Sequence, residues 1–202
     1  MAARRGTRAR RRAPLLLGAL ALGGGTLAAL AACSSAASSF PTPAPAATVA
    51  AADCLAPQVL AALGLGEAVT PAPDAPSPGA VPDGFVATSV LECADGGELL
   101  DSSGTWTSVR ASRLEGDVAG LVEALRLPSS RAKASAACAP DDGTAAPQVW
   151  LVDPLGTAVR PQLPTDACGR VRPEVRRAVE ALERTDDVRY PVALVSPSLP
   201  PG

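Results

Sequence analysis

The spacing of four cysteines constrains the fold of this chain more than any other feature of its 202-residue sequence. Cys54, Cys93, Cys138 and Cys168 lie far apart, form no C-x-x-C pair, and belong to a chain without histidine. Zinc sites and redox-active disulfides generally use closely spaced ligands or thiols, so we expect no metal, no cofactor and no redox chemistry. The pattern instead favours structural disulfides, which are typical of proteins that fold outside the cytoplasm.

The N-terminal segment has the layout of a signal peptide. Six arginines within residues 4–12 precede an uncharged stretch, residues 15–32, that ends in Leu30-Ala31-Ala32-Cys33, a match to the bacterial lipobox. We predict a lipoprotein signal peptide at residues 1–32 and a lipid on Cys33. An uncleaved membrane anchor is the alternative, and both place the chain from residue 34 onward outside the cytoplasm, because the basic flank stays inside. The export route, general secretory or twin-arginine, is left open.

Several stretches have too little apolar surface to order themselves. Residues 34–52 consist mainly of Ala, Ser, Pro and Thr, so we predict that residues 33–52 are the lipidated cysteine and a disordered tether. Residues 197–202 are expected to form a disordered tail. A Pro-rich connector is expected at residues 67–84, within a folded domain that spans residues 53–196.

The four cysteines after Cys33 are an even number in an exported chain, which predicts two disulfides. Three pairings exist, and the sequence alone does not choose among them. We favour Cys54 with Cys93 and Cys138 with Cys168, because each bond would tie a helix end to an adjacent strand or loop. On a loop-closure argument each bond stabilises the fold by roughly 3 to 4 kcal/mol.

Hydrophobic periodicity and turn residues predict a single small α+β domain with about three helices and about five mostly antiparallel strands. Asp53 and Asp117 are expected to cap the first two helices, Gly64 to end the first, and Pro173 to open the third, which carries Arg176, Glu180 and Arg184 on its outer face. Gly96-Gly97 and Ser102-Ser103-Gly104 are expected to supply turns. The predicted strands are residues 85–93, 105–114, 147–153, 157–163 and 188–195, the last with Val188, Tyr190, Val192 and Leu194 on one face.

The charge balance argues against a nucleic-acid partner. The formal net charge is −2, but six of the 17 arginines lie in the predicted signal peptide. Without that segment, 12 basic residues stand against 20 acidic ones, a net charge of −8. The absence of histidine also excludes Ser-His-Asp and Cys-His catalytic arrangements.

One set of motifs resembles uncharacterised secreted or lipid-anchored proteins of actinobacteria: Trp150-Leu-Val-Asp153-x-x-Gly156, then Arg160-Pro161, then Pro164-x-Asp166-x-Cys168-Gly169 followed by an Ala- and Leu-rich helix. The resemblance extends over roughly residues 85–182. It implies an address in the cell envelope and a structural role for the cysteines. It implies no catalytic residue.

Two motifs suggest chemistry but lack its partners. Ser130-Arg131-Ala132-Lys133 matches S-x-x-K, yet neither S-D-N nor K-T-G is present, so we interpret it as a polar loop. A Ser/Lys-type envelope hydrolase or acyl-transferase using Ser130 and Lys133 is the alternative function. The acidic stretches at residues 95–98 and 141–143 lack the pattern of a calcium loop and are interpreted as solvated turns. Trp106 and Trp150 are expected in the core.

Arg170, Arg172, Arg176 and Arg177 form a candidate anion-binding cluster at the start of the third predicted helix. Guanidinium groups bind anions by bidentate contacts, whereas pairing with Glu174, Glu180 and Glu183 is the alternative. We therefore expect a non-enzymatic lipoprotein, lipid-anchored on the extracytoplasmic face of the cell membrane, that is a binding or structural module for an envelope polymer or protein partner. The sequence does not indicate an oligomeric state.

Overall fold

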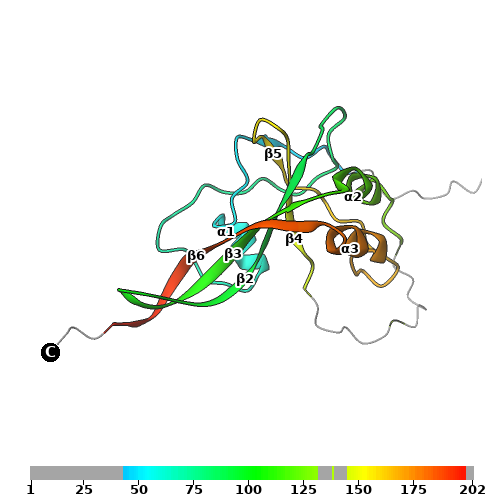
Figure 1. The fold of residues 1–202 in the computed structure, drawn as a ribbon. Helices are drawn as coiled ribbons and strands as arrows, with labels where there is room; N and C mark the ends of the chain where they lie inside the picture. The colour runs from blue at the N-terminus through cyan, green and yellow to red at the C-terminus, as the bar shows by residue number, and fades with distance from the viewer. Residues whose placement is uncertain (1–42, 132–137, 139–144, 199–202) are drawn as a thin grey trace, which may run out of the picture. The chain divides into compact units, whose positions relative to one another are not determined.

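A six-stranded antiparallel sheet with the order β1-β5-β4-β2-β3-β6 organises the protein (Figure 1). The computed structural model describes residues 43–131, 138 and 145–198, all within one compact unit that runs from Ser38 to Gly202. The elements are β1 (Thr48–Val49), α1 (Pro57–Ala62), β2 (Ser89–Asp101), β3 (Gly104–Glu115), α2 (Val118–Leu125), β4 (Gln148–Val152), β5 (Ala158–Val159), α3 (Pro173–Glu180) and β6 (Glu183–Pro197).

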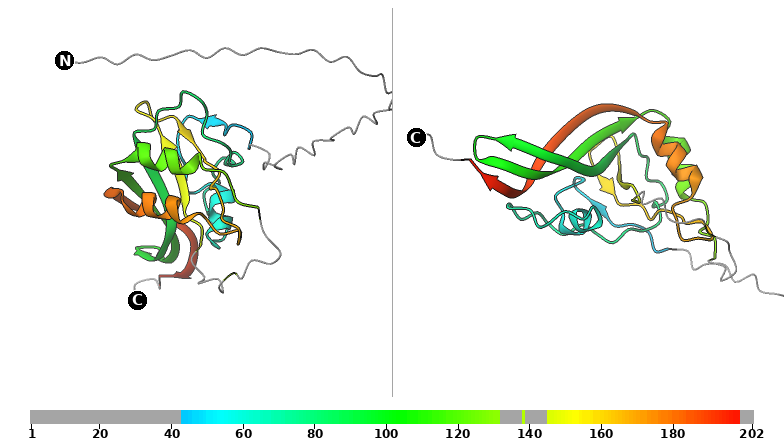
Figure 2. Two further views of the ribbon diagram at one scale, coloured as in Figure 1. Left: turned by 90° about the vertical axis from the view of Figure 1, so that its right-hand side faces the viewer. Right: turned by 90° about the horizontal axis from the view of Figure 1, so that it is seen from below.

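The sheet separates two hydrophobic cores, because successive side chains of a strand point to opposite faces. In β4, Val149 and Leu151 join the core that α2 and α3 cover, whereas Trp150 joins the core under α1. Figure 2 shows α2 and α3 side by side on one side of the sheet and α1 on the other. β5 shows the same pattern: Val159 joins the core that α2 and α3 cover, hereafter the first core, and Ala158 joins the core under α1.

Both favoured disulfides are confirmed, and so is the α+β class. Cys54 bonds to Cys93, which ties the segment before α1 to β2, and Cys138 bonds to Cys168, which lies in the loop before α3. The described residues contain three helices, as predicted, and six strands rather than about five.

The additional strand is β1, and it corrects the predicted tether. Residues 45–49 are not disordered: Pro45 forms a bridge with Ala80, Ala46 is buried in the first core, and β1 pairs with β5. Composition misled the prediction because this segment does not order itself. It adds to an edge that the rest of the sheet already provides, so its backbone groups gain partners without a large apolar side chain.

The first helix begins later than the sequence suggested. Ala56 is the N-cap residue of α1, and Asp53 instead accepts a hydrogen bond from the backbone N–H of Leu55 at 2.8 Å. Pro57 explains the difference, because it restricts the residue before it to an extended conformation. The other predicted cap is confirmed, since the Asp117 carboxylate accepts from the N–H of Gly120 at the start of α2.

Among the described residues, no helix is long and apolar enough to cross a membrane.

The long β2–β3 hairpin turns at residues 101–104 rather than at the glycine pair. Asp101 pairs with Gly104 across Ser102 and Ser103, and its carboxylate accepts from the backbone N–H of Ser103 at 2.7 Å. The predicted turn at Gly96-Gly97 is wrong, because Gly96 is a β-bulge inside β2. A Cβ atom on Gly96 would lie 2.5 Å from Oγ of Ser108, so the close approach of the two strands requires glycine there.

The last strand is longer and less regular than predicted. α3 ends at Glu180, so Arg184 lies in β6, where its Nη2 lies 3.1 Å from a carboxylate oxygen of Glu92. Register shifts in the pairing with β3 leave Thr185, Val192 and Val195 without a partner in that strand. The bulge at Val192 therefore breaks the predicted alternation: Val188 and Tyr190 share one face of the sheet, and Leu194 lies on the other.

Candidate functional site

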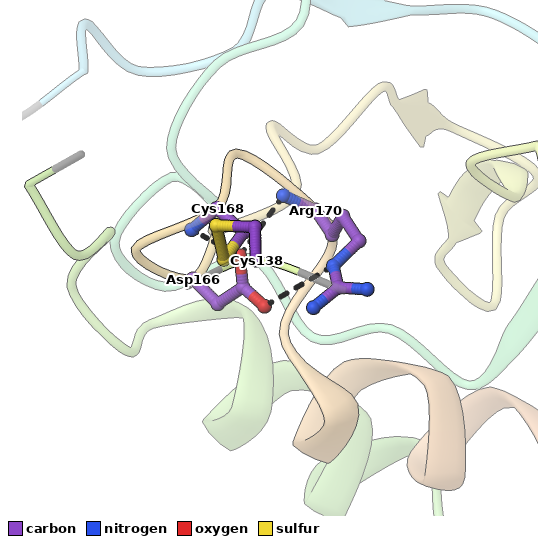
Figure 3. Close-up of a disulfide and its surroundings, with 4 residues drawn as sticks. All are labelled: Cys138, Asp166, Cys168 and Arg170. Atoms are coloured by element: carbon purple, nitrogen blue, oxygen red, sulfur yellow. Dashed lines mark hydrogen bonds and ion pairs between the residues drawn. A yellow bond between two sulfur atoms is a disulfide. The ribbon is translucent and has the colours of Figure 1, made fainter. Parts of the chain in front are cut away.

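The Cys138–Cys168 disulfide lies on a tight loop that one carboxylate organises (Figure 3). Asp166 accepts hydrogen bonds at Oδ1 from the backbone N–H groups of Cys168 at 2.8 Å and Arg170 at 3.0 Å. Its own backbone N–H donates to the carbonyl of Arg170 at 2.8 Å, and Gly169 takes a φ of 77°, which favours glycine. These bonds lower the pKa of Asp166, the largest cause being the N–H of Arg170. The loop is therefore shaped by its sequence as well as by the disulfide.

The structure brings the four candidate arginines to this loop and to α3, but acidic neighbours already engage two of them. Arg170 Nε lies 3.7 Å from Oδ2 of Asp166, and Arg172 Nη2 lies 3.2 Å from Oε1 of Glu174. The Arg172 hydrogen bond is the main reason that the pKa of Glu174 is lowered. Arg176 also has an interaction partner.

Arg177 donates from Nε to the carbonyl of Pro173 at 3.3 Å, within the first turns of α3. One of the predicted ion pairs with the helix carboxylates therefore occurs, and it joins Arg172 to Glu174. Among the ion pairs of the described residues, neither Glu180 nor Glu183 pairs with Arg170, Arg172 or Arg177. The cluster offers an approaching anion less uncompensated charge than four arginines suggest.

A hollow of about 330 Å³ opens beside the same loop. Gly169 and Val171, on either side of Arg170, belong to its lining, as do residues from the ends of β4 and β5 and from the Pro-rich connector. Most of the lining is apolar or proline: Ala62, Pro78, Ala146, Pro147, Val149, Pro161, Leu163, Gly169 and Val171, with Gln148, Arg160, Gln162 and Thr165 as the polar side chains. An apolar concave surface with a few polar groups is the usual form of a small-molecule site.

Arg160 is the one charged side chain of this lining, and it is half-buried. Its Nη2 donates to Oε1 of Gln148 at 2.9 Å, and burial lowers the pKa of its guanidinium. It nevertheless stays charged, because the ordinary pKa of arginine lies so far above neutrality. No carboxylate pairs with Arg160 among the described residues. The hollow therefore contains a partly desolvated cation whose hydrogen-bonded side-chain partner is neutral.

The Ser/Lys motif gains no catalytic geometry from the described residues. The backbone N–H of Ser130 donates to the carbonyl of Thr165 at 2.7 Å, so this segment packs against the strand-like stretch before the disulfide loop. Lys133 lies outside the described residues, as does the acidic stretch at 141–143. The other acidic stretch is a turn-like bulge, where Asp95 accepts from the N–H of Gly97 at 2.8 Å. No group of acidic or cysteine side chains that could hold a metal occurs in the described part of the chain.

The two tryptophans divide between core and surface. Trp150 is buried at 2% exposure in the core under α1, as predicted. Trp106 belongs to neither core cluster of the described residues and is half-buried near the end of the hairpin, where its Nε1 donates to Asp101 at 3.0 Å. That hydrogen bond is the main cause that lowers the pKa of Asp101.

Sequence reasoning missed the role of Arg160. The one signal was a charged residue directly after the apolar pair Ala158-Val159 and directly before Pro161, in a stretch predicted as a strand. A charged side chain at such a position is either exposed to solvent at a strand end or half-buried in a binding site. The sequence does not distinguish the two. The cavity forms from segments far apart in the chain, which the sequence could not place together.

In comparisons with known proteins, the chain matches no family model, no curated protein and no solved structure.

Proposed function

We propose that the protein is a non-enzymatic lipoprotein on the extracytoplasmic face of the cell membrane, anchored by a lipid on Cys33, and that its disulfide-bonded domain binds an envelope component. The lipobox and the basic, then apolar, N-terminal segment support the anchor. Two disulfides are compatible with an extracytoplasmic location. The resemblance to secreted actinobacterial proteins belongs to the same proposal.

The observation that carries the binding role is the half-buried Arg160 in the apolar hollow. Removing a cation from water costs free energy unless a counter-charge compensates for it. Gln148 supplies a hydrogen bond but no charge. A ligand that enters the hollow could supply the missing charge, which makes binding a better explanation of this arrangement than stability alone.

The anchor is tested by comparing Cys33→Ala with Ser34→Ala, a neighbouring substitution of similar size. Wild-type protein and Ser34→Ala should partition into the detergent phase after Triton X-114 extraction. Cys33→Ala should accumulate as an unprocessed precursor or enter the medium, because it lacks the thiol that receives the lipid. Normal processing and unchanged partitioning of Cys33→Ala would contradict lipidation.

The binding role is tested by filling the hollow. Ala146 is exposed and lines the hollow, whereas its neighbour Ala145 is exposed but is not part of the lining. Ala146→Trp should reduce co-sedimentation of the lipid-reconstituted protein with purified cell-wall fragments, and Ala145→Trp should not. Equal co-sedimentation of both variants would show that the hollow is not the site.

The absence of enzymatic activity has its own test. Labelling with a fluorescent penicillin should leave the protein unlabelled. Covalent labelling that Ser130→Ala removes and Ser129→Ala retains would replace the proposed binding function with the Ser/Lys hydrolase.

A further inference from the structure

We propose that the hollow binds a compact organic monocarboxylate group with an apolar body, carried by the envelope component of the proposed function, and that Arg160 pairs with the carboxylate. This inference rests on the proposed binding function and specifies the chemical class of its ligand.

Arg160 is held both at its backbone and at its guanidinium. Its backbone carbonyl accepts from the N–H of Gly79 at 3.1 Å, and its Nη2 donates to Gln148 at 2.9 Å. Gln148 is itself held, since its Nε2 donates to the carbonyl of Ala146 at 3.2 Å. A guanidinium carries five N–H donors in a rigid fork, and the bond to Gln148 uses one of them. The fork is therefore oriented before a ligand arrives, and orientation in advance reduces the entropy cost of binding.

The surroundings favour a carboxylate over a phosphate. Pro78, Pro147 and Pro161 line the hollow, and proline contributes no backbone N–H donor. The other polar side chains of the lining are uncharged. One guanidinium fork matches the two oxygens of a carboxylate, whereas a phosphate presents more charge and more acceptor oxygens than this lining can satisfy.

The apolar walls and the volume define the rest of the ligand. Leu163 is partly buried and Val171 is buried against the first core, so these walls cannot hydrate a polar ligand. A volume of about 330 Å³ equals that of roughly ten water molecules in the liquid. The part of the ligand that enters the hollow is therefore a compact group of about that many non-hydrogen atoms, with one apolar end and one carboxylate.

Benzoate and benzamide form a matched pair of probes, because they share the same ring and the same number of non-hydrogen atoms and differ in charge. Binding should be measured by saturation-transfer NMR and by chemical-shift titration on the full chain in phosphatidylcholine nanodiscs, with empty nanodiscs as the reference. Wild-type protein should bind benzoate at least about ten-fold more tightly than benzamide, as expected for a charge-assisted hydrogen bond. Inorganic phosphate should bind more weakly than benzoate.

Arg160→Gln should remove the preference for benzoate over benzamide, and Arg160→Lys should retain part of it, because lysine keeps the charge but not the fork. Arg126→Gln is the control, since Arg126 pairs with Glu123 on α2 and does not line the hollow. Arg126→Gln should bind both probes as the wild type does. The wild-type comparison of the two probes holds even if Arg160→Gln fails to fold.

Equal binding of benzoate and benzamide by the wild type would overturn the carboxylate assignment, and so would phosphate binding tighter than benzoate. No binding of any probe would overturn it as well. The proposed function fails separately, when Ala146→Trp leaves co-sedimentation with cell-wall fragments unchanged. A carboxylate assignment that fails while Ala146→Trp still abolishes co-sedimentation leaves the binding function in place with a different ligand.

Discussion

Cys54 and Cys93 form a disulfide inside the hydrophobic core under α1, where the two residues are only 4% and 2% exposed. Cys138 and Cys168, in contrast, are exposed and half-buried, respectively. The two bonds close loops of similar length, with sequence separations of 39 and 30 residues, so their entropic contributions should be nearly equal. Burial is what distinguishes them.

The double variant Cys54→Ala/Cys93→Ala should lose about 4 kcal/mol from loop entropy alone, and more because the missing sulfurs leave space in a packed core. Its thermal midpoint, measured by circular dichroism, should fall by at least roughly 10 °C for a chain of this size. The matched variant Cys138→Ala/Cys168→Ala should lose less. A larger loss in the Cys138→Ala/Cys168→Ala variant would contradict this ranking.

Gly79→Ala should destabilise the protein by roughly 1 to 3 kcal/mol, as overpacking does. A Cβ atom there would lie 2.5 Å from the carbonyl oxygen of Ala44 and 2.6 Å from the nitrogen of Ala46, both backbone atoms that cannot rotate away. Gly66→Ala is the control, because a Cβ at Gly66 meets nothing within 4 Å. Urea unfolding of the two variants checks the prediction, and equal midpoints would show that the segment around β1 does not pack closely against the connector.

Asp117→Ala should cost about 1 kcal/mol, because the Asp117 carboxylate caps α2 by accepting from the N–H of Gly120 at 2.9 Å. Asp83→Ala makes the same change in an exposed turn outside the helices and strands, and should stay within about 0.5 kcal/mol of the wild type. Chemical unfolding at neutral pH measures both. An Asp117→Ala variant as stable as Asp83→Ala would show that the cap does not stabilise α2.

Asp166 should make stability depend on pH in acid. Its pKa is lower in the folded protein than in the unfolded chain, mainly because the N–H of Arg170 donates to its carboxylate. Its contribution is therefore complete above the unfolded value of about 3.9 and is lost as the pH falls through the lower, folded value. Asp166→Asn should lower the thermal midpoint at pH 7, and the difference from the wild type should shrink at about pH 2.5. A constant difference across this range would contradict the assignment.

The sequence predicted the parts of the fold that depend on local chemistry. The caps and turns at Asp117, Pro173 and residues 101–104 were predictable because each uses neighbours in the chain. The disulfide pairing was favoured for a similar reason, since each bond was expected to tie a helix end to an adjacent strand or loop. What could not be predicted is where a segment forms its backbone hydrogen bonds with a distant part of the chain, as β1 does with β5.

The same distinction explains the site. The arginine cluster was visible as a run in the sequence, but its pairing with Asp166 and Glu174 depends on how the loop before α3 folds. Arg160 was a single charge with no pattern around it. Its meaning depends on Gln148 and the prolines, which the sheet and connector bring to it from distant positions.

The outer edge of β6 is irregular along much of its length. β6 is the last strand in the sheet order, and an unpaired edge of this length is a template for pairing with another chain. The template is interrupted by three bulges, by Pro191 and by the charges of Asp186, Asp187 and Arg189. The N–H of Val69 also donates a hydrogen bond to the carbonyl of Val192. A protein held on a membrane, as we propose for this one, meets its own copies at a high local concentration. The irregular edge strand would keep such neighbours from joining into a continuous sheet.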